Sequence, residues 1–266
     1  GIILRSRITI DRAFLEKGIN LKFIARVGSG TENIDVVYAN KKQIKIISAG
    51  EANANAVGEP ALGMKLSIKN TIQKSNNEIK EGLWLREKNR GIELKGKTVG
   101  IIGYGKTGKS FAEKLNALGA NVLCNDIVPN KGDNYAIQVS INEIKEKSNI
   151  ISLHTNLNQT SLFLINNCFI DECKNPFYII NTSRGECLKT SDLVEGLKSG
   201  KILGACLDVI ENESKSFEEI DSNSDLDYLK NSKNVIITPH IAGWTYESKV
   251  NLSKVILEKI KYMFDL

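Results

Sequence analysis

The sequence predicts an α/β fold in which a doubly wound parallel sheet follows a smaller α/β unit. From Lys97 onward, short apolar runs alternate regularly with helical patterns, which is typical of parallel strands joined by helical crossovers. The first 50 residues show the same alternation on a smaller scale, and a long helical pattern over 55–74 separates the two parts. We therefore expect a larger and a smaller α/β domain connected by a helix.

The N-terminal part contains short elements that would form a small flavodoxin-like domain. Strands are expected at 2–4, 22–27 and 44–48, and helices at 11–17 and 35–39. A small parallel sheet normally has more β-α units than this, so we expect the domain to be incomplete at its N-terminus. Pro60 is tolerable only in the first turn of the helix that follows.

Residues 76–93 fit neither the helical nor the strand period. Trp84 and Leu85 stand there among charged residues. Exposed apolar side chains on such an arm would suit packing against another surface, such as a second subunit.

The second half of the chain has six expected strands, at 97–102, 121–126, 149–153, 177–181, 202–209 and 235–238. Ser140, with Glu143 three residues later, forms a capping box that should begin a helix. Further helices are expected near 169–174 and over 191–198, the second capped by Thr190 and ended by Gly200. Six strands with crossovers would make a Rossmann-type sheet.

The end of the chain leads back to its beginning. The segment 211–233 is acidic and is interpreted as a loop, and a last helix over about 245–264 would return to the first domain. We therefore expect a substrate domain with its connector helix at 1–74, a cofactor domain at 75–243 and a returning helix at 244–266.

Composition limits the classes of function. The chain of 266 residues has a net charge of +5 spread over Lys-rich helices, which favours anionic small molecules over nucleic acids. Its five cysteines form no C-x-x-C pair, so neither a disulfide framework nor a metal site is indicated. With no signal-peptide pattern and no apolar run long enough to span a bilayer, we expect a cytoplasmic protein that does not bind membranes.

The most informative motif follows the first strand of the larger domain. Gly103, Gly105 and Gly108 have the spacing G-x-G-x-x-G. The first allows a tight turn, the second lets the backbone approach a pyrophosphate, and the third lets the next helix pack closely. The next strand ends in Asp126, where a carboxylate can hold a ribose diol. The motif therefore predicts a nicotinamide dinucleotide, and Asp126 favours NAD because it would repel the extra phosphate of NADP.

Three candidate catalytic residues, Arg184, Glu213 and His240, follow three successive strands. Because the carboxyl ends of parallel strands meet at one edge, we expect these residues near the glycine-rich loop. His240 would take the hydroxyl proton of a substrate while hydride leaves the same carbon, Glu213 would orient the imidazole, and Arg184 would grip a substrate carboxylate. Each residue alone is more often structural, but their joint placement beside a dinucleotide loop favours catalysis.

Further cofactor contacts are expected along the same edge. His154 ends the third strand of the larger domain, and we interpret it as packing beside the cofactor because no Arg or Glu is evidently supplied to it. The other expected contacts come from the glycine-rich loop, from the ends of strands and from the segment after His240. These residues are Tyr104, Lys106, Thr107, Thr155, Thr182, Asp208 and Gly243.

Seven segments together resemble the D-isomer-specific 2-hydroxyacid dehydrogenase family, and the resemblance runs over essentially the whole chain. The segments are 5–7, 26–35, 100–105, 151–155, 181–185, 204–209 and 238–243. The resemblance implies the same catalytic triad and a homodimer whose cofactor domains pair. It also implies that Ser29, Gly30 and Asn53 border the substrate.

Within the family, the sequence is most similar to short-type D-3-phosphoglycerate dehydrogenases, in which a pair matching Arg5 and Ser6 helps to bind the substrate phosphate. Two departures from the family pattern matter most. Its opening strand and helix are absent before Gly1, and the usual proline does not follow Glu213. The second departure leaves Glu211 as a rival for the position beside the histidine.

We therefore expect an NAD-dependent dehydrogenase of D-2-hydroxy acids that acts on 3-phosphoglycerate in serine biosynthesis. Glycerate, glyoxylate and lactate are alternative substrates, because substrate choice depends on the N-terminal loops, where the sequence is least conclusive. A third alternative is a catalytically silent NAD-sensing protein similar to a corepressor, since one fold can host both functions. A binding protein would not need the complete triad, which argues against this alternative.

Overall fold

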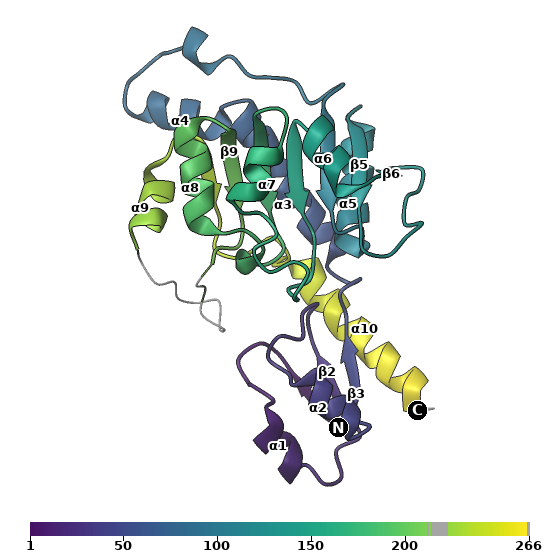
Figure 1. Cartoon of the computed structure of the whole chain (residues 1–266). Helices are drawn as coiled ribbons and strands as arrows, with labels where there is room; N and C mark the ends of the chain where they lie inside the picture. Colours follow the sequence, from purple (N-terminus) through teal and green to yellow (C-terminus); the bar gives the residue numbers. More distant parts are fainter. Residues whose placement is uncertain (212, 214–222, 265–266) are drawn as a thin grey trace.

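The computed structural model describes residues 1–211, 213 and 223–264 as two lobes (Figure 1). The larger lobe contains a seven-stranded sheet and the smaller lobe a three-stranded sheet, and both are parallel. None of the helices in the described part of the chain is long and apolar enough to cross a membrane. The expected α/β class is confirmed.

The larger sheet has the strand order β10-β9-β8-β7-β4-β5-β6. Its strands are β4 Thr98–Ile102, β5 Asn121–Asn125, β6 Ile137–Gln138, β7 Ile150–Leu153, β8 Phe177–Asn181, β9 Ile202–Leu207 and β10 Val235–Ile237. Successive strands extend outward from β4 in one direction and from β7 in the other, so the switch point lies between β4 and β7. This is the expected Rossmann arrangement, with β6 added. Two residues are too few to show a strand period, which is why β6 was not expected.

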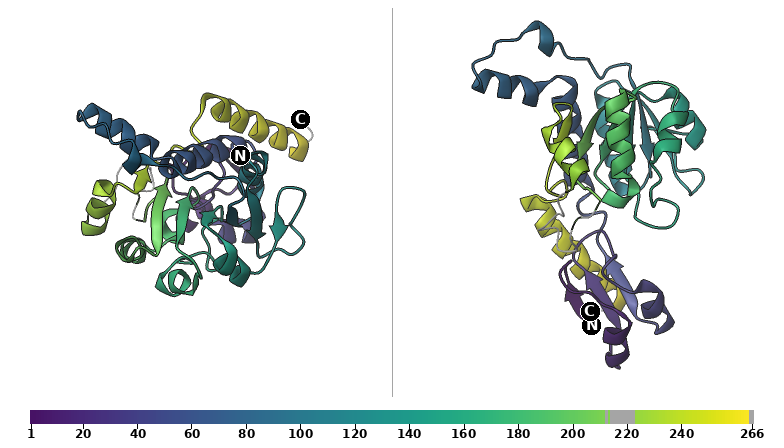
Figure 2. Two further views of the ribbon diagram at one scale, coloured as in Figure 1. Left: turned by 90° about the horizontal axis from the view of Figure 1, so that it is seen from above. Right: turned by 60° about the vertical axis from the view of Figure 1, so that its left-hand side comes forward.

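Helices cover both faces of the larger sheet, so the expected doubly wound architecture is confirmed (Figure 2). These helices are α3 Ala54–Lys69, α5 Lys106–Ala117, α6 Ile141–Lys147, α7 Asn167–Glu172, α8 Thr190–Ser199 and α9 Ser224–Asn231. The expected capping box begins α6: Ser140 Oγ accepts a hydrogen bond from the Glu143 N–H, and the Glu143 carboxylate accepts one from the Ser140 N–H.

Two local expectations in this lobe are wrong. Thr190 does not cap α8 but is its first residue, and its N–H donates to Glu211 Oε2 at 3.0 Å. The segment 211–233 is not all loop, because α9 lies within it. Asn223 caps α9, and two acidic residues in its first turn interact favourably with the helix dipole. The same acidic residues had suggested a solvated loop.

The smaller lobe is built from the expected alternation of strands and helices. Its elements are β1 Ile2–Leu4, α1 Arg12–Lys17, β2 Phe23–Arg26, α2 Val36–Lys41 and β3 Lys45–Ser48. Asp11 and Asp35 cap the two helices by accepting hydrogen bonds from the backbone of the first turn. Leu15 of α1 and Ala39 of α2 belong to the buried cluster that also contains Ile24 of β2.

The last helix, α10 Tyr246–Phe264, packs against the smaller sheet as expected (Figure 1). Leu252, Ile256 and Ile260 form a buried cluster with residues of β2 and β3. Lys259 Nζ also donates to the carbonyl oxygen of Ser48 at 2.7 Å. Helix α10 therefore belongs to the same lobe as β2 and β3.

The helical stretch 55–74 is divided into two helices. Because α3 begins at Ala54, Pro60 lies beyond the first turn, contrary to expectation. Packing of α3 against α5 and the larger sheet offsets the backbone hydrogen bond that proline cannot donate. Thr71, with a left-handed φ of 53°, separates α3 from α4 Ile72–Lys80, which begins an arm that continues through η1 Glu87–Asn89.

Lys65 on α3 is fully buried, and its Nζ has no hydrogen-bond partner among the described residues. The ammonium lies 4.2 Å from the centre of the Tyr178 ring. Burial, with a contribution from the charge of Lys69, lowers the pKa of Lys65 from 10.5 to about 7. The native state therefore binds the Lys65 proton less tightly than the unfolded chain does.

Lys65→Met should stabilise the protein, and the gain should be larger at pH 6 than at pH 10. The cost of the buried ammonium is fully present below the native pKa and disappears as the pH rises through the unfolded pKa near 10.5. We expect a gain of at least ~2 kcal/mol at pH 6, measured by urea unfolding at both pH values. The exposed Lys41→Met is the control and should change little. An equal gain at both pH values would contradict this account.

Candidate functional site

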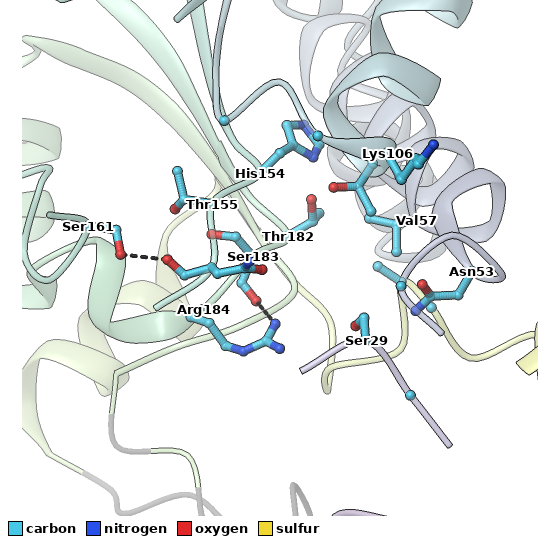
Figure 3. Close-up of a pocket in the computed structure, with 18 of the residues that line it drawn as sticks. Ser29, Asn53, Val57, Lys106, His154, Thr155, Ser161, Thr182, Ser183 and Arg184 are labelled. Atoms are coloured by element: carbon cyan, nitrogen blue, oxygen red, sulfur yellow. Dashed lines mark hydrogen bonds between the residues drawn. The ribbon is translucent and has the colours of Figure 1, made fainter. Parts of the chain in front are cut away.

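A cavity of about 700 Å³ lies between the carboxyl edge of the larger sheet and the smaller lobe. Figure 3 shows Thr182 and Arg184 on one side of it and Ser29 and Asn53 on the other. Most residues expected at the site line this cavity. They are Arg5, Ser6, Ser29, Asn53, Gly103, Gly105, Lys106, Thr107, Asp126, His154, Thr155, Thr182, Arg184, Asp208, His240 and Gly243. Tyr104, Gly108, Gly30 and Glu213 are not among the lining residues.

The three glycines of the loop after β4 have different surroundings. Gly103 has a φ of 89°, and a Cβ there would lie 2.7 Å from the His154 carbonyl oxygen. A Cβ on Gly108 would lie 2.3 Å from the Gly103 carbonyl oxygen, so this residue lets α5 approach the loop. At Gly105, a Cβ would meet no described atom within 4 Å. This open face, at the N-terminus of α5, fits a pyrophosphate group.

Asp126 follows β5 and fixes the shape of this loop. Its carboxylate accepts hydrogen bonds from the N–H of Tyr104 at 2.7 Å and of Val128 at 2.9 Å. The Tyr104 side chain is buried and its hydroxyl donates to Asp133 at 2.8 Å. The Tyr104 side chain therefore supports the loop from behind, and the contact of this residue with a cofactor stays a prediction.

Four buried polar atoms of the cavity lining have no hydrogen-bond partner among the described residues. They are Arg26 Nε, Asn53 Oδ1, His154 Nδ1 and Thr182 Oγ1. Buried polar atoms normally find a partner, so these four fit a site built for a polar ligand. Together with the open face at Gly105 and the carboxylate of Asp126, they fit a dinucleotide.

His154 is unsuited to proton transfer. It is buried against the Phe111 ring, with 5.3 Å between ring centres, and its Nε2 shares a hydrogen bond of 2.9 Å with Ser152 Oγ. Burial lowers the pKa of His154 to about 3, so the imidazole is neutral at physiological pH. This agrees with its interpretation as a packing residue.

His240 pairs with Glu213. The His240 Nδ1 lies 2.7 Å from Glu213 Oε2, and the second carboxylate oxygen of Glu213 accepts a hydrogen bond from the Ile210 N–H at 2.5 Å. The rival Glu211 instead accepts from Thr190 at the start of α8. Of the two glutamates, only Glu213 is therefore hydrogen-bonded to the histidine ring.

Asp208 holds the turn that carries His240. Its buried carboxylate accepts hydrogen bonds from Thr238 Oγ1 at 2.6 Å, from the Ile241 N–H at 2.8 Å and from the Ala242 N–H at 2.9 Å. His240 has a left-handed φ of 54°, which is costly for a residue other than glycine and persists where the surroundings enforce it. The Asp208 carboxylate therefore organises this turn, and because Asp208 also lines the cavity, its contact with a cofactor stays a prediction.

Arg184 follows β8 and reaches toward the smaller lobe. Its Nε donates to Glu32 Oε1 at 2.7 Å. Its Nη1 donates to the Ser183 carbonyl oxygen at 2.6 Å (Figure 3). Gly30 lies against this pair, because a Cβ there would be 2.0 Å from Glu32 Oε2 and 2.3 Å from Arg184 Nη2.

Sequence reasoning missed two prominent residues of the lining, Arg26 and Trp244. Arg26 ends β2, so applying the carboxyl-edge rule to the smaller sheet would have identified it. The guanidinium carbon of Arg5 lies 4.7 Å from the centre of the Trp244 ring. No sequence pattern distinguishes Trp244 from any exposed aromatic residue.

Comparisons with known proteins agree with this geometry. Residues 62–242 match the family model described as D-isomer specific 2-hydroxyacid dehydrogenase, NAD binding domain. The chain is 32% identical to a D-3-phosphoglycerate dehydrogenase of Archaeoglobus fulgidus over 99% of its own length and 49% of the relative. It is 34% identical to a hydroxypyruvate reductase of Thermotoga maritima over 97% of its length and 83% of that relative.

Among solved structures, the chain resembles the D-lactate dehydrogenase of Aquifex aeolicus complexed with NAD and lactic acid. The TM-score is 0.86 at 27% identity, over 98% of this chain and 82% of that one. The chain thus spans about half the length of the phosphoglycerate dehydrogenase and most of the other two proteins. It belongs to the D-isomer-specific 2-hydroxyacid dehydrogenase family, and its larger lobe is the NAD-binding domain of that family.

Proposed function

We propose that the protein is an NAD-dependent dehydrogenase that transfers hydride between a D-2-hydroxy acid and NAD. The observation that carries this proposal is the hydrogen-bonded pair of His240 and Glu213, which shares one cavity edge with Arg184 and the glycine-rich loop. A proton acceptor, a cationic carboxylate clamp and a dinucleotide site are the parts this reaction needs. A protein that only binds NAD as a sensor would not need the hydrogen-bonded pair of His240 and Glu213.

In the oxidative direction, the substrate hydroxyl proton passes to Nε2 of His240, because Nδ1 donates to Glu213. As the O–H bond breaks, the hydrogen on the same carbon leaves with its electron pair and a carbonyl group forms. NAD, when bound, supplies the acceptor for that hydride. Glu213 holds the ring orientation and stabilises the imidazolium, and Arg184 binds the carboxylate next to the reacting carbon.

We propose D-3-phosphoglycerate, the precursor of serine, as the substrate. Arg5, Arg26 and Ser6 line the same cavity as Arg184, so two cations besides the carboxylate clamp face the bound acid. Burial lowers the pKa of Arg26 despite the nearby charge of Glu32, so a further anion such as a phosphate would stabilise its guanidinium. Hydroxypyruvate is the second candidate, because the chain is 34% identical to a hydroxypyruvate reductase over 97% of its own length.

The exposed arm supports a further proposal, a homodimer formed through the cofactor domains. Trp84 in this arm is 82% exposed, and Ile72, Ile79 and Leu83 of the same arm are also exposed. Apolar side chains gathered on one extension suit burial against a partner subunit. The sequence places the connector helix with the substrate domain at 1–74, but α3 packs on α5 and the larger sheet. We therefore propose that the substrate domain comprises residues 1–53 with the returning helix 244–266, and that the cofactor domain comprises 54–243.

His240→Ala should lower turnover by about two to four orders of magnitude, the usual contribution of general acid–base catalysis. NAD affinity, measured by calorimetry, should stay nearly unchanged. Turnover is measured as NAD reduction on D-3-phosphoglycerate, D-glycerate and D-lactate and as NADH oxidation on hydroxypyruvate and glyoxylate. The phosphorylated acid should have the highest kcat/KM in the unaltered protein. Full activity of the variant would exclude this mechanism.

Two neighbouring glutamates give a matched test of the loop after β9. Glu213→Gln should lower turnover by about tenfold or more, because it weakens the support of the imidazolium, while its amide oxygen can still accept from the Ile210 N–H. Glu211→Gln should leave turnover unchanged and lower the unfolding free energy by about 1 kcal/mol, because it weakens the bond to the first N–H of α8. If Glu211→Gln lowered turnover and Glu213→Gln did not, Glu211 rather than Glu213 would be the residue that supports the imidazolium.

Asp126→Asn should raise the affinity for NADP relative to NAD by about tenfold, because it removes a charge that repels the extra phosphate. The amide oxygen can still accept from the Tyr104 N–H, so the glycine-rich turn should keep its shape, whereas the bond from the Val128 N–H is lost. Affinities are measured by calorimetry with both cofactors, and Asp171→Asn on α7 serves as the control. A preference of the unaltered protein for NADP would contradict the assignment.

A further inference from the structure

Glu32 lies on the loop after β2 in the smaller lobe, and it forms an ion pair with Arg184 of the larger lobe. The Glu32 side chain is 38% exposed and that of Arg184 is 18% exposed, so the pair lies partly buried where the lobes meet. Nε of the guanidinium donates to Glu32 and Nη1 donates to the Ser183 carbonyl oxygen. The guanidinium group of Arg184 is therefore held from both lobes. Its Nη2 makes no hydrogen bond to the described residues.

Nearby positive charges stabilise the ionised form of the Glu32 carboxyl. Burial would raise the pKa of the Glu32 carboxyl, but the positive charge and hydrogen bond of Arg184, with the charge of Arg26, hold it below its ordinary value. Arg5 also contributes to the positive charge around Arg26. The Glu32 anion thus offsets the mutual repulsion of three arginines that line one cavity.

Gly30 makes room for the pair. The three atoms nearest to a Cβ at residue 30, which are Oε2 and Cδ of Glu32 and Nη2 of Arg184, all lie at the ends of flexible side chains. A side chain there would push these ends apart without disturbing the backbone. The resemblance placed Gly30 at the substrate, and the structure gives it a different reason to be glycine.

We propose that Glu32 is a positioning residue that holds Arg184 by Nε, so that the remaining guanidinium edge receives the carboxylate of the substrate. This rests on the proposed function only in assigning the substrate carboxylate to Arg184. Because the smaller lobe carries Glu32 and the larger lobe carries Arg184, the clamp has its working geometry only while the two lobes are apposed.

The first experiment compares Glu32→Ala, Glu32→Gln and Gly30→Ala, with Glu16→Gln as the matched control. Glu16 is a carboxylate of the same lobe that pairs with Nε of Arg12 at 2.9 Å, outside the cavity. All three test variants should raise KM for the 2-hydroxy acid by about tenfold, with a smaller fall in kcat and unchanged NAD affinity and Tm. The Gln variant, which keeps an acceptor for Nε, should be the mildest of the three.

Arg184→Lys supplies the test of mechanism, because a single ammonium cannot be held by Glu32 at one edge and offer a second, two-pronged edge to the substrate carboxylate. Adding Glu32→Ala to Arg184→Lys should cause little further loss, whereas two independent residues would show additive losses. Additive losses, or a Glu32→Ala variant whose Tm and NAD affinity fall together with its activity, would overturn the proposal.

A measurement independent of activity separates this proposal from the proposed function. The ¹⁵N-labelled protein should show an Arg184 Nε–H resonance, assigned by its loss in Arg184→Lys, that shifts in Glu32→Gln and in Gly30→Ala but not in Glu16→Gln. Binding of oxamate, a carboxylate analogue of a 2-oxo acid, to the protein with NADH should weaken in the same variants. Weakened oxamate binding without turnover on any substrate would refute the dehydrogenase activity alone. An unshifted resonance or unchanged oxamate affinity would refute the role of Glu32.

Discussion

The buried carboxylate of Asp208 fixes the part of the molecule on which the site depends. This carboxylate joins the end of β9 to the turn after β10, because it accepts hydrogen bonds from Thr238, Ile241 and Ala242. The backbone carbonyl oxygen of Asp208 accepts a further hydrogen bond from the His240 N–H at 2.8 Å. A buried carboxylate without such donors would cost several kcal/mol, so this turn and this charge stabilise each other. These hydrogen bonds hold the His240 backbone in its strained left-handed conformation.

The turn held by Asp208 is also where the chain crosses toward the smaller lobe. The other crossing precedes α3, and the two crossings touch, since a Cβ on Gly243 would lie 2.8 Å from Asn53 Nδ2. The ion pair of Glu32 and Arg184 forms a third link between the lobes. Asn53, Gly243 and Arg184, one residue from each of these links, line the same cavity. The shape of this cavity therefore depends on how the two lobes are apposed.

The parts that the sequence predicts well are those governed by local rules. The glycine spacing, the strand alternation and the capping box at Ser140 each depend on residues close together in the chain, and the structure contains all of them. The failures arise where local signals are weak or ambiguous. Two-residue β6 has no readable period, and acidic residues suit both a solvated loop and the first turn of α9.

Carboxylates show most clearly what sequence reasoning alone cannot decide. Asp208, Glu211 and Glu213 lie within six positions and share the same chemistry, yet one holds a turn, one bonds to the start of α8 and one pairs with His240. The carboxyl-edge rule predicts that such groups gather at one edge of a sheet, but their donors come from strands and helices distant in the chain. The same rule extends to the smaller sheet, where it would have found Arg26, because both sheets turn this edge toward one cavity. Location therefore follows from topology, whereas each role depends on which donor the fold brings within hydrogen-bonding distance.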